Sequence, residues 1–164
     1  MTKLTAQRLR ELLHYSPDTG VFTWRVSRGG AVCAGDSAGY GNGAGYRKIY
    51  IDGGQYMAHR LAWLYTHGSW PSGVIDHRDG DRSNNAIANI RDVSICVNNQ
   101  NQKRAHSSNR SCGLLGVTRD SAGMWQARIR VDGKRRYLGT FKDQEQAGAA
   151  YIAAKRLLHA GCTI

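Results

Sequence analysis

The chain of 164 residues is 41% hydrophobic and 21% charged, a composition that allows a buried core and excludes a chain disordered along its whole length. Its formal net charge of +11 favours a polyanionic partner, nucleic acid before a membrane surface, with a generically basic soluble protein as the alternative. No apolar run is long enough to cross a bilayer and no signal peptide opens the chain, so we expect neither a membrane protein nor a secreted one.

Residues 1–57 are expected to form a leader region of mixed α and β structure. Leucines near helical spacing predict a helix over 4–14, with Thr5 as its N-cap, and the turn residues at 16–20 end it. A short strand is expected at 21–24, because β-branched and aromatic residues follow one another there.

Turns and a hairpin are expected next. Residues 27–45 are rich in Gly, Ala and Ser and lack the Lys-Ser/Thr of a P-loop, so they predict turns and not a phosphate cradle. Runs at 46–51 and 55–58 flank Asp52-Gly53-Gly54, which predicts a β-hairpin. A helix over 58–68 follows and ends at a glycine C-cap. It carries two histidines of open role, for which a packed or capping place is favoured over a catalytic one: His59 and His67.

The stretch from Val74 to Lys103 is unusually rich in amide side chains. It opens with Asp76-His77, and six asparagines fall within eighteen residues: Asn84, Asn85, Asn89, Asn98, Asn99 and Asn101. Asparagine has poor helix and strand propensity and costs free energy when it is buried without partners, so an ordinary core segment is not expected. A carboxylate, an imidazole and several amides suit a hard divalent cation with a general base beside it. A capped polar turn without metal is the alternative.

The spacing of these residues carries a resemblance. Asn89 follows Asp76 by thirteen residues, Asn98 follows Asn89 by nine, and His77 stands directly after the aspartate. From Val74 onwards the segment resembles the ββα-metal site of HNH endonucleases, in the phage-type branch that includes homing endonucleases.

The same pattern predicts how this unit is built. We expect a first strand at 74–77, a polar loop, a returning strand at 86–93, and a helix that Ser94 caps. With the preceding helix, these elements form an expected nuclease unit over 58–104.

The resemblance also implies roles for the residues. His77 would take a proton from water, and the side-chain carbonyl of Asn89 would hold the imidazole N–H. Asp76 and Asn98 would supply oxygen ligands to one Mg²⁺ or Mn²⁺. The family often has His at the last ligand, so an amide there predicts modest metal affinity. The alternatives for this second ligand are Asn99 and Asn101.

The last third of the chain, residues 111–164, is its most basic part, with nine Lys and Arg against four acidic residues. Asp132-Gly133 between two alternating runs predicts a two-residue hairpin, and a helix over 144–160 is expected to cover its apolar face. The pairs expected on the other face are Arg130 with Arg135 and Arg128 with Tyr137. Like charges so placed would repel one another unless the face meets phosphates or guanines; a solvated charged face is the alternative.

A second resemblance covers residues 113–161. The motifs Leu115-Gly116-Val117, Trp125-x-Ala127-x-Ile129 and Tyr137-Leu138-Gly139-Thr140-Phe141 are similar to the APETALA-type DNA-binding domain of plant ethylene-response factors. That fold implies a three-stranded antiparallel sheet backed by one helix, with the sheet in the major groove, over 113–164 after a basic linker at 105–112. The implied DNA-binding residues are Arg119, Arg128, Arg130, Arg135 and Tyr137. Arg128 and Ala122 depart from the family pattern, so the plant factors' target sequence does not carry over.

The cysteines point to a reducing compartment. Cys33, Cys96, Cys112 and Cys162 form no C-x-x-C pair, so no structural zinc is expected. Free thiols without a secretion signal predict a cytoplasmic protein, in a bacterial host if a phage encodes it.

Together these observations predict an α+β DNA endonuclease, with a ββα-metal HNH unit followed by a three-stranded antiparallel sheet packed on one helix. Its expected partner is double-stranded DNA, without a membrane or a small-molecule substrate, and one active site per chain would nick one strand. The rival interpretation is a non-catalytic DNA-binding regulator with a degenerate HNH unit. An RNA-binding or RNA-cleaving protein fits the charge, but the A-form major groove is too narrow for a reading sheet. The pattern favours no particular target sequence, oligomeric state or biological setting.

Overall fold

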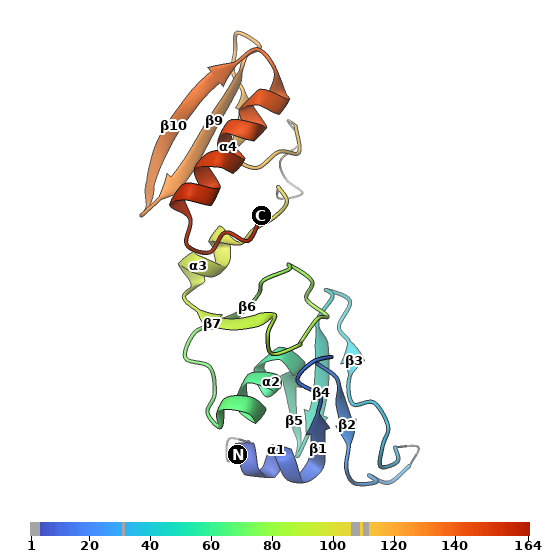
Figure 1. Ribbon diagram of the computed structural model, residues 1–164. Coiled ribbons are helices and arrows are strands. Elements are labelled where there is room, and N and C mark those ends of the chain that lie inside the picture. Colours follow the sequence, from blue (N-terminus) through green and yellow to red (C-terminus); the bar gives the residue numbers. More distant parts are fainter. Residues whose placement is uncertain (1–3, 31, 106–108, 110–111) are drawn as a thin grey trace. The chain divides into compact units, whose positions relative to one another are not determined.

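The computed structural model describes residues 4–30, 32–105, 109 and 112–164, and the chain divides into two compact units, Met1–Ile95 and Cys96–Ile164. Within the described residues the fold is mixed, with four helices and several small antiparallel sheets. Figure 1 labels these elements. None of the described helices is long and apolar enough to cross a membrane. The expected nuclease unit over 58–104 contains residues of both compact units, and its boundaries remain a prediction.

The first unit begins with the predicted helix, in a shorter form. Helix α1 spans Ala6–Leu12, and the Thr5 side chain accepts a hydrogen bond from the Arg8 backbone N–H at 3.1 Å, which confirms the predicted N-cap. The end of the predicted helix is wrong, because β1 (Leu13–Tyr15) pairs antiparallel with β2 (Phe22–Trp24). Alternate residues of both strands are buried, so the strand conformation covers more apolar surface than a further helical turn.

A second sheet follows in the order β3-β4-β5, formed by Tyr40–Gly41, Arg47–Ile51 and Gly54–Met57. The predicted hairpin is confirmed, with Asp52 and Gly53 at its turn and φ values of 45° and 82°. Helix α2 (Ala58–His67) ends as predicted at Gly68, which has a φ of 77° and donates its N–H to the Leu64 carbonyl at 2.9 Å.

The core of the first unit supports the strands that follow it. Side chains from α1, β1, β4 and α2 are fully buried together, among them Leu9, Leu13, Ile49, Ile51 and Leu61. Ile75 and Ile90 join the same cluster from β6 (Val74–His77) and β7 (Ile90–Val93), which pair antiparallel. The first of these strands lies where it was predicted.

The returning strand is shorter than predicted. Residues 86–89 form a turn before β7, with the Asn89 N–H bonded to the Ala86 carbonyl at 2.9 Å. Asparagine side chains compete locally for backbone groups and favour turns over strands, which accounts for the difference.

The second unit contains the helix that follows Ser94 and the C-terminal module. Helix α3 covers Ile95–Gln100, and β8 (Val117–Arg119), β9 (Trp125–Val131) and β10 (Lys134–Phe141) form one sheet in the order β10-β9-β8. Helix α4 (Gln144–Leu158) runs along one face of this sheet in Figure 1, and it ends two residues before the predicted 160. The predicted linker at 105–112 lies largely outside the described residues.

The module has the expected layers. Ala127, Ile129 and Val131 of β9 are buried against Ala147 and Tyr151 of α4. The register shifts between Tyr137 and Gly139, so Leu138 is an extra residue in β10 that packs into the apolar layer. The structure therefore has three antiparallel strands backed by one helix.

Candidate active site

The β6–β7 hairpin places Asp76 and His77 next to each other, and both are buried, with 4% and 5% of their surface exposed. Arg91 lies opposite Asp76, and its Nε and Nη2 atoms are each 2.8 Å from Asp76 Oδ2. A buried carboxylate needs a partner charge, and this guanidinium supplies it while it fixes the direction of the side chain.

The His77 ring is held by an asparagine other than the one that the motif spacing predicts. His77 Nε2 lies 3.2 Å from Oδ1 of Asn85, a residue only 1% exposed. An amide oxygen can only accept, so Nε2 is the donor in this contact, which in a neutral imidazole leaves the lone pair on Nδ1. This tautomer suits a general base. The asparagine-rich pattern contained Asn85, but spacing alone did not distinguish it from its neighbours.

Asn89 has a different contact from the one predicted. Its Nδ2 donates to Asp79 Oδ1 at 3.0 Å and to the Asn84 carbonyl at 2.8 Å, and its Oδ1 accepts from the Asp79 N–H at 3.1 Å. These bonds close the loop between β6 and β7. The predicted hydrogen bond to His77 is therefore corrected: Asn85 makes it, and Asn89 organises the loop that carries Asn85.

Two further sets of contacts hold this loop, one around the Asp79 carboxylate and one around the Arg82 guanidinium. Burial acts to raise the pKa of Asp79, but hydrogen bonds from Asn84, the Asp81 N–H and Asn89 outweigh it and hold the pKa below its usual value. Arg82 donates to the Ala44 carbonyl at 3.1 Å, and its guanidinium lies 5.0 Å from the Tyr46 ring. The loop is thus tied to the turn between β3 and β4.

His59 lies beside His77 in the interior of the unit. The two rings meet edge to face with their centres 5.2 Å apart, and His59 is 8% exposed. Its Nδ1 is buried and has no hydrogen-bond partner among the described residues. Burial, with the charges of His77 and Arg60 adding to it, lowers the pKa of His59 to about 4. His59 is therefore a neutral packed ring at pH 7.

His67 has a separate place. It is exposed, its ring stacks on Trp63 with the centres 3.9 Å apart, and its Nδ1 lies 3.2 Å from the Trp63 carbonyl. A histidine at the end of α2 that contacts a carbonyl one turn earlier has a capping geometry.

The predicted metal ligands belong to different units. Asp76 lies on β6 of the first unit, and Asn98 lies on α3 with the second, so their joint role remains a prediction. Of the two alternatives to Asn98, Asn101 is 6% exposed and accepts a hydrogen bond from the Thr163 hydroxyl at 2.5 Å, whereas Asn99 is exposed.

The described residues contain no group of three or more His, Cys, Asp and Glu that could hold a metal. One carboxylate with amide oxygens fits a hard cation that takes its remaining ligands from water and from the substrate's phosphate. HNH nucleases are generally dependent on a divalent metal, and this donor set is consistent with that dependence.

A second candidate surface is the outer face of the β8–β10 sheet. The predicted pairs are confirmed, with Arg130 opposite Arg135 and Arg128 opposite Tyr137, and all four side chains are exposed. Arg119 is separated from them. It is exposed but pairs with Trp125, so strand alternation places it on the side that faces α4, and its guanidinium lies 5.5 Å from the Trp125 ring. Arg119 therefore does not lie on the sheet face that was implied to bind DNA.

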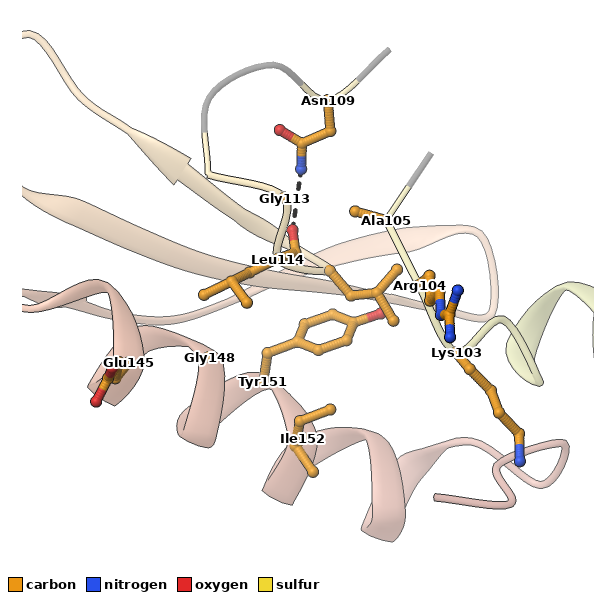
Figure 2. Close-up of a pocket in the computed structure, with 11 residues that line it drawn as sticks. Lys103, Arg104, Ala105, Asn109, Gly113, Leu114, Glu145, Gly148, Tyr151 and Ile152 are labelled. Carbon is orange, nitrogen blue, oxygen red and sulfur yellow. Dashed lines mark hydrogen bonds between the residues drawn. The ribbon is translucent and has the colours of Figure 1, made fainter. Parts of the chain in front are cut away.

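The second unit also contains a pocket of about 610 Å³. Tyr151 and Ile152 of α4 line it together with Leu114, whose carbonyl accepts a hydrogen bond from the Asn109 side chain at 2.9 Å, as Figure 2 shows. Lys103 and Arg104 complete a mixed apolar and basic lining. No predicted site residue is among the described residues that line it.

Comparison with known proteins agrees with the location of the buried pair. Residues 56–100 match the family model for HNH endonuclease, a range that runs from β5 through α3 and includes Asp76, His77 and Asn85. The chain matches no curated protein and no solved structure. The match supports a nuclease that cleaves DNA.

Proposed function

We propose that the chain is a divalent-metal-dependent DNA endonuclease, of the phage homing type that its motif spacing resembles. One observation carries the proposal. Within the range that matches the HNH family, a buried histidine stands directly after a buried aspartate at the end of β6, and a buried amide holds its Nε2.

His77 is the proposed general base. Its Nδ1 accepts a proton from a water molecule as that water attacks the phosphorus of the scissile phosphodiester. The bond from phosphorus to the 3′ oxygen breaks, and the departing oxygen takes a proton from solvent. Asn85 keeps Nε2 protonated, so that the same nitrogen, Nδ1, always holds the lone pair.

Asp76 is the proposed carboxylate ligand of the cation, and Asn98 is the proposed second ligand. A bound divalent cation at such a site neutralises charge on the phosphate and on the leaving oxygen. Arg91 holds the Asp76 carboxylate in one orientation, which lowers the cost of ordering it when the cation binds.

The second unit is proposed to position the nuclease on double-stranded DNA. The exposed side chains Arg128, Arg130, Arg135 and Tyr137 lie on the sheet face away from α4, and the like charges across β9 and β10 gain most from contact with phosphates. A twisted antiparallel ribbon fits the B-form major groove. One active site per chain predicts a nick in one strand, so a break of both strands needs a dimer or two successive events.

The test is nicking of supercoiled plasmid with Mg²⁺ or Mn²⁺, wild type beside His77→Ala. Loss of a general base lowers the rate by about 10²- to 10⁴-fold, while DNA binding in a gel shift stays within a few-fold. Equal cleavage by both proteins excludes His77 as the base.

The exposed arginine face supports one other function, a DNA-binding regulator without catalysis. If both proteins bind DNA but neither cuts plasmid or DNA from the source genome, the regulator replaces the nuclease. Comparing gel shifts on duplex DNA and duplex RNA tests the proposed substrate in the same experiment.

A further inference from the structure

A segment near the N-terminus lies directly against the asparagine that holds His77. The Tyr15 hydroxyl donates to the Asn85 carbonyl at 2.8 Å, and the Ile87 N–H donates to the Pro17 carbonyl at 2.9 Å. The segment Tyr15–Gly20, which runs from the end of β1 towards β2, is thus bonded to the residues on both sides of Ala86. Tyr15 and Asn85 are seventy residues apart in sequence.

Gly20 brings the two backbones into direct contact. It has a φ of +72°, and a Cβ atom there would lie 2.3 Å from the Asn85 carbonyl carbon and 2.4 Å from the Ala86 nitrogen. Backbone atoms cannot move aside as a flexible side chain can, so this approach requires a residue without a side chain.

Tyr15 is itself firmly placed. It is 1% exposed, and its ring lies 4.7 Å from the Phe22 ring and 5.6 Å from the Tyr65 ring, measured between centres. Burial, with the charge of Asp18 adding to it, raises the pKa of Tyr15 to about 12, so the phenol keeps its proton and stays a donor.

Asn85 therefore has its backbone and its side chain engaged by different partners. Its carbonyl accepts from Tyr15, and its Oδ1 accepts from His77 Nε2. With only 1% of its surface exposed, the residue has little room for another rotamer. The edge-to-face contact of His59 limits the His77 ring from a second side.

We propose that Asn85 is the positioning residue for His77, and that the segment Tyr15–Gly20 fixes Asn85 by clamping its backbone. The leader region is then a structural part of the catalytic site, since it determines which imidazole nitrogen holds the lone pair. The expected effect on rate rests on the proposed nuclease function. The expected effect on the His77 tautomer does not depend on that function.

The experiment uses the full chain with four variants. Asn85→Leu removes the acceptor, Asn85→Asp restores it, Tyr15→Phe removes the hydroxyl that holds the Asn85 carbonyl, and Tyr65→Phe is the matched control. Tyr65 belongs to the same ring cluster, so it tests loss of a hydroxyl without loss of the clamp. For each protein the kcat and KM of plasmid nicking are measured, together with the imidazole ¹⁵N shifts of His77 at pH 8.

Asn85→Leu is expected to lower kcat by about 10- to 100-fold with little change in KM, and to replace the single Nε2–H tautomer of His77 by a mixture. Asn85→Asp should recover most of the loss in kcat. Tyr15→Phe should show a smaller fall in kcat in the same direction, and Tyr65→Phe should match the wild type.

Two results overturn the inference. One is a wild-type kcat in Asn85→Leu, and the other is an unchanged His77 tautomer in Asn85→Leu and Tyr15→Phe. If Asn85→Leu does not fold, Tyr15→Phe decides by the same two readouts. A wild-type protein that does not nick, but whose His77 tautomer depends on Asn85, overturns the nuclease and supports the positioning.

Discussion

Asp76 and Arg91 face each other across the β6–β7 hairpin, with two guanidinium nitrogens 2.8 Å from one carboxylate oxygen. The pair is largely buried, with 5% of the Asp76 side chain and 18% of the Arg91 side chain exposed. If Asp76 is a metal ligand, it meets the cation as a carboxylate already oriented by a fixed positive charge. That positive charge would also weaken the attraction between the carboxylate and a cation, in the direction of the modest metal affinity that the sequence predicts.

The first prediction concerns this carboxylate. Asp76→Asn keeps an oxygen for Arg91 but loses the ligand charge, so half-maximal nicking should need at least about tenfold more Mg²⁺ or Mn²⁺. EDTA should stop wild-type cleavage, and added metal should restore it. The measurement is a titration of nicking rate against metal concentration.

Asp92→Asn is the matched control. Asp92 lies on the same hairpin opposite Ile75, and its carboxylate accepts hydrogen bonds from Ser72 and Gly73. Its metal dependence should equal that of the wild type. An Asp76→Asn protein with the wild-type metal titration would remove Asp76 from the ligand set.

The second prediction concerns the arginine face. Replacing Arg130 and Arg135 by Gln should weaken binding to duplex DNA and reduce the slope of log affinity against log salt by about two, one for each lost phosphate contact. The measurement is a set of binding isotherms between roughly 50 and 200 mM salt, a range over which the loss of phosphate contacts changes the affinity strongly. Arg156→Gln is the control, since Arg156 is exposed on α4, which covers the opposite face. An equal loss of slope in Arg156→Gln would show that charge alone, and not the sheet face, binds DNA.

The third prediction concerns Gly20. Gly20→Ala should destabilise the protein by roughly 3 kcal/mol or more, because the new methyl group would clash with the backbone of Asn85 and because alanine is strained at this positive φ. Gly53→Ala has a similar φ of +82° but nothing within 4 Å of its Cβ, so it should cost only about 1–2 kcal/mol. Urea unfolding of both variants measures the difference. Equal destabilisation would mean that the close approach at Gly20 relaxes without cost.

The fourth prediction concerns pH. His59 has a pKa of about 4 in the folded protein and 6.5 ordinarily, so between these values the unfolded chain binds a proton that the folded chain does not. The free energy of unfolding should therefore be undiminished above about pH 7 and fall as the pH drops towards 4, by roughly 3 kcal/mol in all. Urea unfolding at several pH values between these limits measures the slope.

His59→Phe should lose most of this slope, whereas His67→Phe, on the exposed end of the same helix, should keep it. The carboxylates with lowered pKa, such as Asp79, act at lower pH. An unchanged slope in His59→Phe would place the acid sensitivity elsewhere.

Local pattern determined much of this protein. The Thr5 cap, the Gly68 end of α2, both hairpins and the pairing of Arg130 with Arg135 were predictable, because each depends on residues that are neighbours in sequence or joined by a short turn. The same holds for Asp76 and His77 at the end of β6, and the comparison at residues 56–100 agrees with the motif spacing.

Only the tertiary structure decided which amide serves which side chain. Several asparagines follow His77 in sequence, and spacing favoured Asn89, but in the folded chain Asn85 lies against Tyr15 and Gly20 and its side chain contacts the imidazole. Likewise, Leu13 left the predicted helix because pairing with Trp24 buries it in the core. Both outcomes depend on contacts between segments distant in sequence, whose free energy outweighs the local preference that a sequence pattern records.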